Sequence, residues 1–320
     1  MNILIIGPAL SNKGRGNRRT AVRWGRILVA LGHEVTFGNE YNGQNCDLLL
    51  ALHAIQSADS VRAFRDANPD RPVVLALTGT DIYGLGSMFD EAGRDKAHRT
   101  MELATTLVAF HPLAVDEVPE KIRDKMTVIY QSLHVPGELP PRRQDVFEVC
   151  VVGELREVKD PFRTGLAARQ LSPDSNVRVL HAGAASSEQM AERAAKEEQN
   201  NARYNWLGEV SSAEALKLIA RSRLLSITSR HEGGPNVLTE ALALGTPIVA
   251  SFIAGNAGIL GDDYPGYFEV EDTEALSELL RRAATDDGFY QSLRDHCAGL
   301  SQLASPEREE EAWKELLAAV

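Results

Sequence analysis

The residues best suited to chemistry lie in the segment Ser229–Ala250, which reads SRHEGGPNVLTEALALGTPIVA. Two carboxylates, Glu232 and Glu240, stand eight positions apart on either side of Gly-Gly-Pro-Asn. Residues 224–228 (LLSIT) are typical of a buried strand, and Pro235 suits the first turn of a helix, where its missing N–H costs nothing. Because the first N–H groups of a helix have no partner within it, this strand–turn–helix pattern predicts a phosphate site.

The same pattern keeps the two carboxylates apart. Glu232 is expected on the turn and Glu240 about two turns into the helix, which ends at Gly245-Thr246-Pro247. A close acid pair is therefore excluded, and the two side chains suit separate contacts to the hydroxyl groups of one extended ligand. The alternative is a pair of ordinary acidic residues near a helix start, where the helix dipole favours them.

The spacing E-x7-E, followed by A-x-A-x-G-x-P-I-V, resembles the donor-site signature of retaining GT-B glycosyltransferases. The resemblance implies that Glu240 holds the ribose hydroxyl groups of a nucleotide sugar and that Glu232 faces the sugar. It implies a donor site that also includes Gly233, Gly234, Pro235 and Asn236.

A second loop, VVGELREVKDP (residues 151–161), follows another predicted strand. The strand is expected to end at Gly153, which leaves Arg156 and Lys159 on the connection to the next helix. Two cations beside the carboxyl end of a strand can neutralise a diphosphate. GT-B enzymes commonly have Gly-Arg where this chain has Gly153-Glu154, so the resemblance assigns the donor diphosphate to Arg156 and Lys159. Ordinary surface charges on a loop are the alternative.

The amino-terminal loop GPALSNKGRGNRRTA (residues 7–21) concentrates positive charge at the expected start of a helix. The first 33 residues contain no acidic residue, although the whole chain carries a formal charge of −11. Cations together with the first N–H groups of a helix would hold a small, phosphate-like acceptor. The predicted acceptor-binding residues of this loop are Lys13, Arg15, Gly16, Asn17, Arg18 and Arg19, with Asn17 as the helix cap.

A nicotinamide-dinucleotide loop is the rival interpretation of this segment. The pattern G-x-G-x-x-G is absent, and the acidic ribose ligand expected near the end of the second strand could only be Glu40. No cofactor is therefore expected. Further along the predicted helix, Arg23 and Arg26 are expected on the solvent-facing side.

Polar residues also follow other predicted strands of the first half. His53 in ALHA and Thr78 and Thr80 in TGTD come directly after apolar runs, so they are predicted to contribute to acceptor binding. A structural histidine and helix-capping threonines are the alternatives. Gln131-Ser132 has a similar placement. Asp262-Asp263 is interpreted as a turn, and no bound metal is expected.

Composition narrows the class of protein. The excess of acidic over basic residues makes nonspecific nucleic-acid binding unfavourable. No run approaches the ~20 apolar residues of a membrane span. The N-terminus lacks the charged segment followed by an apolar segment that is typical of a signal peptide. Three scattered cysteines, an odd number, argue against a disulfide framework or a zinc site and favour free thiols in a reducing cytoplasm.

Strand and helix patterns alternate from end to end. Such alternation predicts an α/β fold with parallel sheets and helices on both faces. The predicted strands cover residues 3–6, 35–37, 48–51, 73–77, 106–110 and 128–130, then 147–152, 177–182, 204–207, 224–228 and 248–250.

The proline-rich stretch PGELPPRRQ (residues 136–144) interrupts this alternation and has the composition of a linker. It divides the chain into a predicted acceptor-side domain, residues 1–140, and a predicted donor-binding domain, residues 141–305. Both are expected to be doubly wound, Rossmann-like domains that face each other across a cleft, as in the GT-B fold. The last helix, within residues 306–320, is expected to return to the first domain.

Longer motifs extend the resemblance to nearly the whole chain. They are GNRRTAVRW (16–24), ALHA (51–54), ALTGTDIY (76–83), VVGELREVKDPF (151–162), NARYNWLGE (201–209), HEGGPNVLTEAL (231–242) and GDDYPGYF (261–268). Together they resemble the selenosugar synthase family of selenoneine biosynthesis (SenB-like). That family transfers N-acetylglucosamine or glucose from a UDP-sugar to selenophosphate, forming a C–Se bond and releasing UDP.

The resemblance implies UDP-N-acetylglucosamine or UDP-glucose as the donor, selenophosphate as the acceptor, and Glu232, Arg156 and Lys159 as catalytic residues. Selenophosphate is already nucleophilic, so no strong general base is required. Three alternatives remain: a conventional glycosyltransferase with a sugar or thiol acceptor, a GT-B-fold epimerase, and a noncatalytic sensor of sugar nucleotides.

Overall fold

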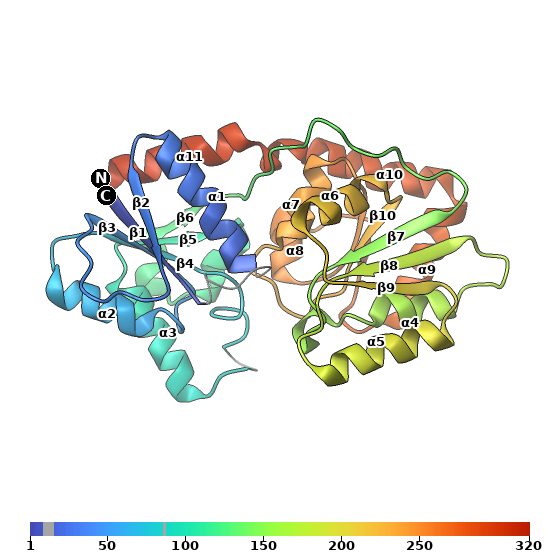
Figure 1. Cartoon of the computed structure of the whole chain (residues 1–320), viewed down its shortest axis with the longest axis horizontal. Coiled ribbons are helices and arrows are strands. Elements are labelled where there is room, and N and C mark those ends of the chain that lie inside the picture. The colour runs from blue at the N-terminus through green and yellow to red at the C-terminus, as the bar shows by residue number, and fades with distance from the viewer. Residues whose placement is uncertain (9–15, 86–87) are drawn as a thin grey trace. The chain divides into compact units, whose positions relative to one another are not determined.

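The computed structural model describes residues 1–8, 16–85 and 88–320 (Figure 1). The chain divides into two compact units. Unit 1 comprises Met1–Gln131, Glu232–Gly234 and Pro306–Val320, and unit 2 comprises Ser132–His231 and Pro235–Ser305. The last helix therefore belongs to unit 1, and so do three residues of the predicted donor loop.

Unit 1 is built on a parallel sheet. Among its described residues, six strands pair in the order β2-β1-β3-β4-β5-β6. Its strands are β1 (Asn2–Ile6), β2 (Glu34–Gly38), β3 (Leu48–Leu52), β4 (Val73–Ala76), β5 (Thr106–Ala109) and β6 (Met126–Val128). Its helices are α1 (Gly16–Ala30), α2 (Ala58–Ala67), α3 (Glu91–Leu103), η1 (Pro112–Glu117), η2 (Glu120–Lys125) and α11 (Pro306–Ala319).

Alternating side chains of these strands enter two apolar layers. In β1, Ile3 and Ile5 pack with Trp24 of α1 and Trp313 of α11, whereas Leu4 and Ile6 pack in the layer that contains α2 and α3. This two-residue period is that of a strand buried on both faces. The rings of Trp24 and Trp313 meet edge to face, with centroids 4.8 Å apart. Figure 1 shows α1 and α11 on one face of the sheet and α2 and α3 on the other.

Unit 2 repeats the architecture, with six parallel strands in the order β12-β11-β10-β7-β8-β9. Its strands are β7 (Phe147–Val152), β8 (Val177–Ala182), β9 (Tyr204–Gly208), β10 (Leu224–Ile227), β11 (Ile248–Ser251) and β12 (Tyr267–Phe268). Its helices are η3 (Glu157–Lys159), α4 (Arg163–Arg169), α5 (Glu188–Asn200), α6 (Ser212–Arg221), α7 (Asn236–Ala243), α8 (Ala254–Leu260), α9 (Thr273–Thr285), α10 (Asp287–Gly299) and η4 (Ser301–Ala304).

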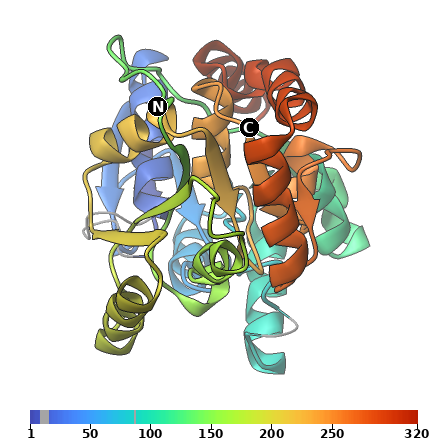
Figure 2. The ribbon, with the colours of Figure 1, turned by 90° about the vertical axis from the view of Figure 1, so that its right-hand side faces the viewer.

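Helices cover both faces of this second sheet. Figures 1 and 2 show α6 and α7 on one face, and α4, α5 and α9 on the other. Local signals fix where some of these helices begin: Ser211 and Glu214 form a reciprocal capping box at the start of α6. The predicted α/β class with two parallel, doubly wound sheets is confirmed.

Candidate functional site

The two central strands of unit 2 define where its loops gather. From the adjacent strands β7 and β10, the sheet extends to β8 and β9 on one side and to β11 and β12 on the other. Open parallel sheets bind ligands outside the carboxyl ends of their strands, at such a change of direction. The loops that follow β7 and β10 therefore form the candidate site of unit 2, and we call this place the switch point.

Hydrogen bonds join the two loops at the switch point. The hydroxyl group of Thr228 is shared between the carbonyl oxygens of Lys159 and Asp160, each 2.9 Å from Oγ1. The backbone N–H of Arg230 donates to the carbonyl oxygen of Val158 at 2.8 Å. Asp160 is buried and has a φ of 42°, in the left-handed region that few residues other than glycine adopt. The backbone that carries Lys159 is thus fixed against the end of β10.

The residues predicted to hold a diphosphate all lie on the loop after β7. Lys159 is half-buried at the end of η3, and Arg156 is exposed, with its Nε 3.1 Å from a carboxylate oxygen of Glu154. A Cβ atom built on Gly153 would meet no described atom within 4 Å, so the backbone there is open to a ligand. Arg156 has to exchange its contact with Glu154 to bind a diphosphate. Of the two cations, Lys159 has the more firmly fixed backbone.

Glu240 lies in α7, on the other side of the switch point. The helix starts at Asn236, so the predicted distance of two turns is wrong: Glu240 is the fifth residue, just over one turn from the start. Its side chain is buried, with 4% of the residue exposed, which is rare for a carboxylate. Pro235, which precedes α7, makes no side-chain capping hydrogen bond to the N-terminus of this helix. The dipole of this helix therefore favours an anion there.

Two residues near the end of β8, His181 and Gly183, lie against the carbonyl group of Gly153. The sequence patterns did not predict either of them as part of the site. Nε2 of buried His181 lies 3.3 Å from the carbonyl oxygen of Gly153, and Nδ1 lies 2.9 Å from the hydroxyl group of Tyr204. Because a carbonyl oxygen only accepts, Nε2 carries the proton and the tyrosine donates to Nδ1. A Cβ atom on Gly183 would lie 1.8 Å from the oxygen of Gly153. Only glycine fits at position 183 without displacing the loop.

Burial lowers the pKa of His181, and likewise that of His111 in unit 1, to about 4. Both rings stay neutral in the folded protein, whereas unfolded histidine takes up a proton below about pH 6.5. Stability should therefore fall as the pH falls from about 6.5 towards 4, by about 2 kcal/mol per histidine at pH 5. Urea unfolding at pH 7.5 and pH 5 measures the loss.

The variant His181→Gln isolates the contribution of unit 2, because glutamine does not titrate and retains a donor for Gly153. Its free energy of unfolding should depend less steeply on pH than that of the wild type, again by about 2 kcal/mol between these two pH values. Equal pH dependence in both proteins would contradict a neutral buried ring.

In unit 1, the loops after β3 and β4 are tied together by a buried carboxylate. Asp81 accepts hydrogen bonds from the N–H groups of Ala54, Thr78 and Gly79, at distances of 2.7 to 2.9 Å for the shortest contact of each. His53 has a φ of 76°, and its Nε2 lies 3.1 Å from the hydroxyl group of Thr80. The three predicted acceptor residues of these loops, His53, Thr78 and Thr80, are therefore brought together.

The short segment Glu232–Gly234 groups with these loops in unit 1. A Cβ atom on Gly233 would lie 2.6 Å from the backbone nitrogen of Gly79, and one on Gly234 would lie 2.5 Å from Phe110. Gly234 also has a φ of 147°, which side chains rarely allow. The double glycine is thus required by close backbone packing inside unit 1. Glu232, Gly233 and Gly234 fall in unit 1, whereas the other predicted donor residues fall in unit 2.

The prediction that Asn17 caps the start of α1 is wrong. The helix begins at Gly16, so Asn17 is its second residue and does not precede it as a cap. Arg18 and Arg19 lie in the first turn and are half-buried, and this turn has no acidic residue. Cations are unfavourable at this end of a helix unless an anion is near. The predicted residues Lys13 and Arg15 lie outside the described part of the chain.

The prediction that Arg23 faces solvent is wrong. Its Nε lies 3.0 Å from a carboxylate oxygen of buried Glu309 in α11, and only 18% of its side chain is exposed. Trp24 donates to the same carboxylate at 2.8 Å. Arg26 is exposed, as predicted. The ion pair joins two helices that are 286 positions apart in sequence, a distance that local periodicity does not reveal.

A pair formed by buried His111 and half-buried Tyr83 follows β5 and β4 and was not predicted. The tyrosine oxygen lies 2.9 Å from Nε2 of His111, and the two rings stack. His111 is fully buried, and its Nδ1 has no hydrogen-bond partner in the described part of unit 1. Burial, together with Glu117 and Asp81, raises the pKa of Tyr83. The phenol therefore stays protonated over the physiological range.

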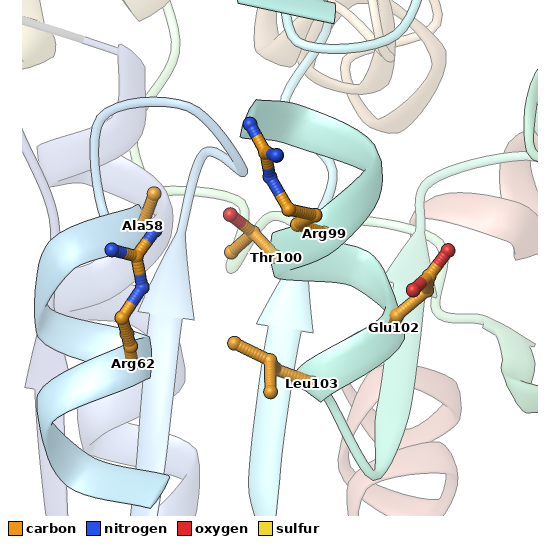
Figure 3. Close-up of a pocket in the computed structure, with 6 residues that line it drawn as sticks. All are labelled: Ala58, Arg62, Arg99, Thr100, Glu102 and Leu103. Carbon is orange, nitrogen blue, oxygen red and sulfur yellow. The ribbon is translucent and has the colours of Figure 1, made fainter. Parts of the chain in front are cut away.

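A cavity of about 570 Å³ lies elsewhere, between α2 and α3 (Figure 3). It is lined by Ala58, Arg62, Arg99, Thr100, Glu102 and Leu103. None of the predicted site residues lines it. Over residues 1–8, 16–85 and 88–320, no helix is long and apolar enough to cross a membrane, and no three metal-ligating side chains gather.

Solved structures share this fold along the whole chain. HepE of Anabaena, in complex with UDP and glucose, superposes with a TM-score of 0.77 at 15% identity over 100% of both chains. Sucrose-phosphate synthase of Thermosynechococcus elongatus gives 0.79 at 15% identity, also over 100% of both chains. An E. coli structure described as "trehalose-6-phosphate" bound with UDP-2-fluoro glucose gives 0.73 at 12% identity over 100% of this chain and 98% of that chain. A search of curated protein sequences found no match.

The two doubly wound sheets are those of the GT-B fold, which confirms the predicted fold class. Residues 140–298 match the family model described as "Glycosyl transferases group 1". The matched segment contains the whole sheet of unit 2, and the chain is a glycosyltransferase.

Proposed function

We propose that this glycosyltransferase is a selenosugar synthase, which transfers N-acetylglucosamine or glucose from a UDP-sugar to selenophosphate. The observation that carries the proposal is the pair of hydrogen-bonded loops at the switch point, in a group 1 glycosyltransferase domain. The UDP complexes of structures with the same fold support UDP as the nucleotide. The motif resemblance supports selenophosphate as the acceptor.

In this proposal the donor is held mainly by its nucleotide. Glu240 accepts hydrogen bonds from the ribose hydroxyl groups, and the start of α7, where Pro235 makes no side-chain capping bond, favours the diphosphate. Lys159, with Arg156, neutralises the charge that develops on the diphosphate as the glycosidic bond breaks. Gly153 lets the ligand approach the backbone, because no described atom fills the space beside it. Glu232, Gly233 and Gly234 position the hexose.

The acceptor in this proposal is a small anion held by unit 1. Arg18 and Arg19 stand in the first turn of α1 without an acidic neighbour in that turn, which suits a phosphate group. His53, Thr78 and Thr80 present polar groups at the carboxyl ends of β3 and β4, where sheets of this kind bind ligands. Lys13 and Arg15 are proposed to add positive charge.

The reaction then needs little covalent chemistry from the protein. A lone pair of selenium attacks the anomeric carbon and forms the C–Se bond, while the C–O bond to the diphosphate breaks and its electron pair leaves with UDP. The cations at the switch point stabilise that departing charge, and no proton has to be removed from the nucleophile. Catalysis rests on positioning and on preorganised electrostatics.

Mass spectrometry of the products tests the function. Incubation with UDP-N-acetylglucosamine or UDP-glucose plus selenophosphate should give UDP and a sugar product that carries selenium. Parallel incubations with thiophosphate, with simple sugars and with low-molecular-weight thiols serve as controls for acceptor choice.

Each alternative predicts a different product. Transfer to a sugar or thiol but not to selenophosphate would identify a conventional glycosyltransferase. Conversion of the UDP-sugar without an acceptor would identify an epimerase, and binding without release of UDP would identify a sensor. Any of these three results contradicts the proposal.

We also propose a cytoplasmic location. Cys46, Cys150 and Cys297 are buried free thiols, and burial raises the pKa of each. Free cysteines of this kind are usual in a reducing compartment.

A further inference from the structure

A polar chain in unit 1 connects the last helix to the glycine turn of the predicted donor loop. At its centre is Gln131, which follows β6 and is 3% exposed. Its Oε1 accepts from the guanidinium of Arg23 at 2.7 Å and from the hydroxyl group of Thr20 at 3.1 Å. Its Nε2 donates to the carbonyl oxygen of Gly234 at 2.6 Å.

These partners fix which way the amide of Gln131 points. A guanidinium only donates, so Arg23 requires the oxygen of the amide to face it. The carbonyl group of Gly234 only accepts, so it requires the amide nitrogen. Turning the amide around would place two donors together and two acceptors together. Arg23 itself is fixed by Glu309 of α11, with both carboxylate oxygens within 3.1 Å of its Nε.

The accepting partner, Gly234, has a backbone that needs such support. It has a φ of 147°, and its neighbour Gly233 lies against the backbone of Gly79. A glycine has many accessible conformations, so a turn of two glycines stays in one conformation only if its contacts define it. The hydrogen bond from Gln131 is a direct contact to the carbonyl group of this turn.

We propose that Gln131 is a positioning residue for transfer, and that Arg23 and Glu309 hold it in place. This inference rests on the proposed function, in which Glu232, Gly233 and Gly234 position the hexose. Gln131 sets the conformation of the turn, and the turn sets where the hexose lies. The nucleotide, held by residues of unit 2, does not depend on Gln131.

The variant Gln131→Glu tests this role with little change in volume. Its carboxylate still accepts from Thr20 and Arg23 but cannot donate to Gly234, and the nearby guanidinium favours the ionised form. We expect a protein that still unfolds cooperatively, with a lower Tm because a carboxylate oxygen now faces the carbonyl oxygen of Gly234. The Kd for UDP, measured by calorimetry, should be unchanged. The kcat/KM for UDP release from the UDP-sugar with selenophosphate should fall at least tenfold. Thr20→Val is the matched control, because it removes a partner of Gln131 but not the contact with Gly234, and it should stay within twofold of the wild type.

Three outcomes would overturn the positioning role: wild-type kcat/KM in Gln131→Glu, an equal loss of UDP affinity, or a loss of folding that makes the residue merely structural. Gln131→Met, which removes all three hydrogen bonds, should lose at least as much kcat/KM as Gln131→Glu, and smaller losses would also count against the role. A wild-type protein that neither binds UDP nor releases it from a UDP-sugar would contradict the proposed function itself, whatever the variants do.

Discussion

Replacing Lys159 by alanine should lower kcat for sugar transfer by a factor of about 30 to 1,000. The loss corresponds to ~2–4 kcal/mol, the usual size of one preorganised electrostatic contact to the transition state. The backbone of Lys159 is fixed by Thr228, so we expect its ammonium group to need little reorganisation if it binds the departing diphosphate as proposed. Steady-state rates of UDP release measure the effect.

Lys196→Ala is the matched control for this experiment. Lys196 is an exposed lysine of α5 in the same unit, and its removal changes the net charge equally. It should leave kcat within twofold of the wild type. Full turnover in Lys159→Ala, or equal losses in both variants, would show that a local contact at the switch point does not stabilise the leaving group.

The second large effect is expected from Gly183→Ala, which should destabilise unit 2 by about 3 kcal/mol. The new Cβ atom would lie 1.8 Å from the oxygen of Gly153 and 2.5 Å from its carbonyl carbon, and backbone atoms cannot move aside cheaply. Overpacking of this kind costs about 1–3 kcal/mol, and more where the neighbours cannot relax. Because Gly153 lies on the loop that we propose to bind the diphosphate, UDP affinity should fall as well. Thermal unfolding and calorimetry with UDP measure both effects.

The variant Gly153→Ala should lower UDP affinity without lowering stability, whereas Gly183→Ala should lower both. A Cβ atom at Gly153 meets no described atom within 4 Å, so the folded protein tolerates it and its Tm should not fall. Its UDP affinity should still fall, because the methyl group would occupy the space proposed for the diphosphate. Gly299→Ala, at an equally open position at the end of α10, controls for the general effect of adding a methyl group to a glycine. Unchanged UDP affinity in Gly153→Ala would place the diphosphate elsewhere.

Two strands of unit 2 were predicted with their exact bounds. β7 and β8 begin and end at the predicted residues, because their apolar runs stop sharply at polar or glycine-containing turns. β6 was predicted at residues 128–130 but covers Met126–Val128, because its side chains are half-buried at the sheet edge and leave only a weak pattern. β12 has two residues and is too short for any periodicity.

Local patterns also indicated the loops of the site, but not the contacts that hold them. The loop residues Lys159 and His53 follow strands as predicted, since strand ends can be recognised from sequence. The contact between Gln131 and Gly234 joins positions 103 apart, and that between Arg23 and Glu309 joins positions 286 apart. Nothing in the neighbourhood of one residue specifies such a distant partner. The assignments of the predicted donor and acceptor residues stay predictions for the experiments above.

The place of α11 in unit 1 has a consequence for biosynthesis. The strands of unit 1 emerge from the ribosome first, but the layer around Trp24 lacks Trp313, and Arg23 lacks Glu309, until residues 306–320 have followed. Residues 132–231 and 235–305, with the second sheet, are translated in between. We therefore expect unit 1 to complete its core only after the residues of unit 2 have been made, and to keep an exposed apolar face until then.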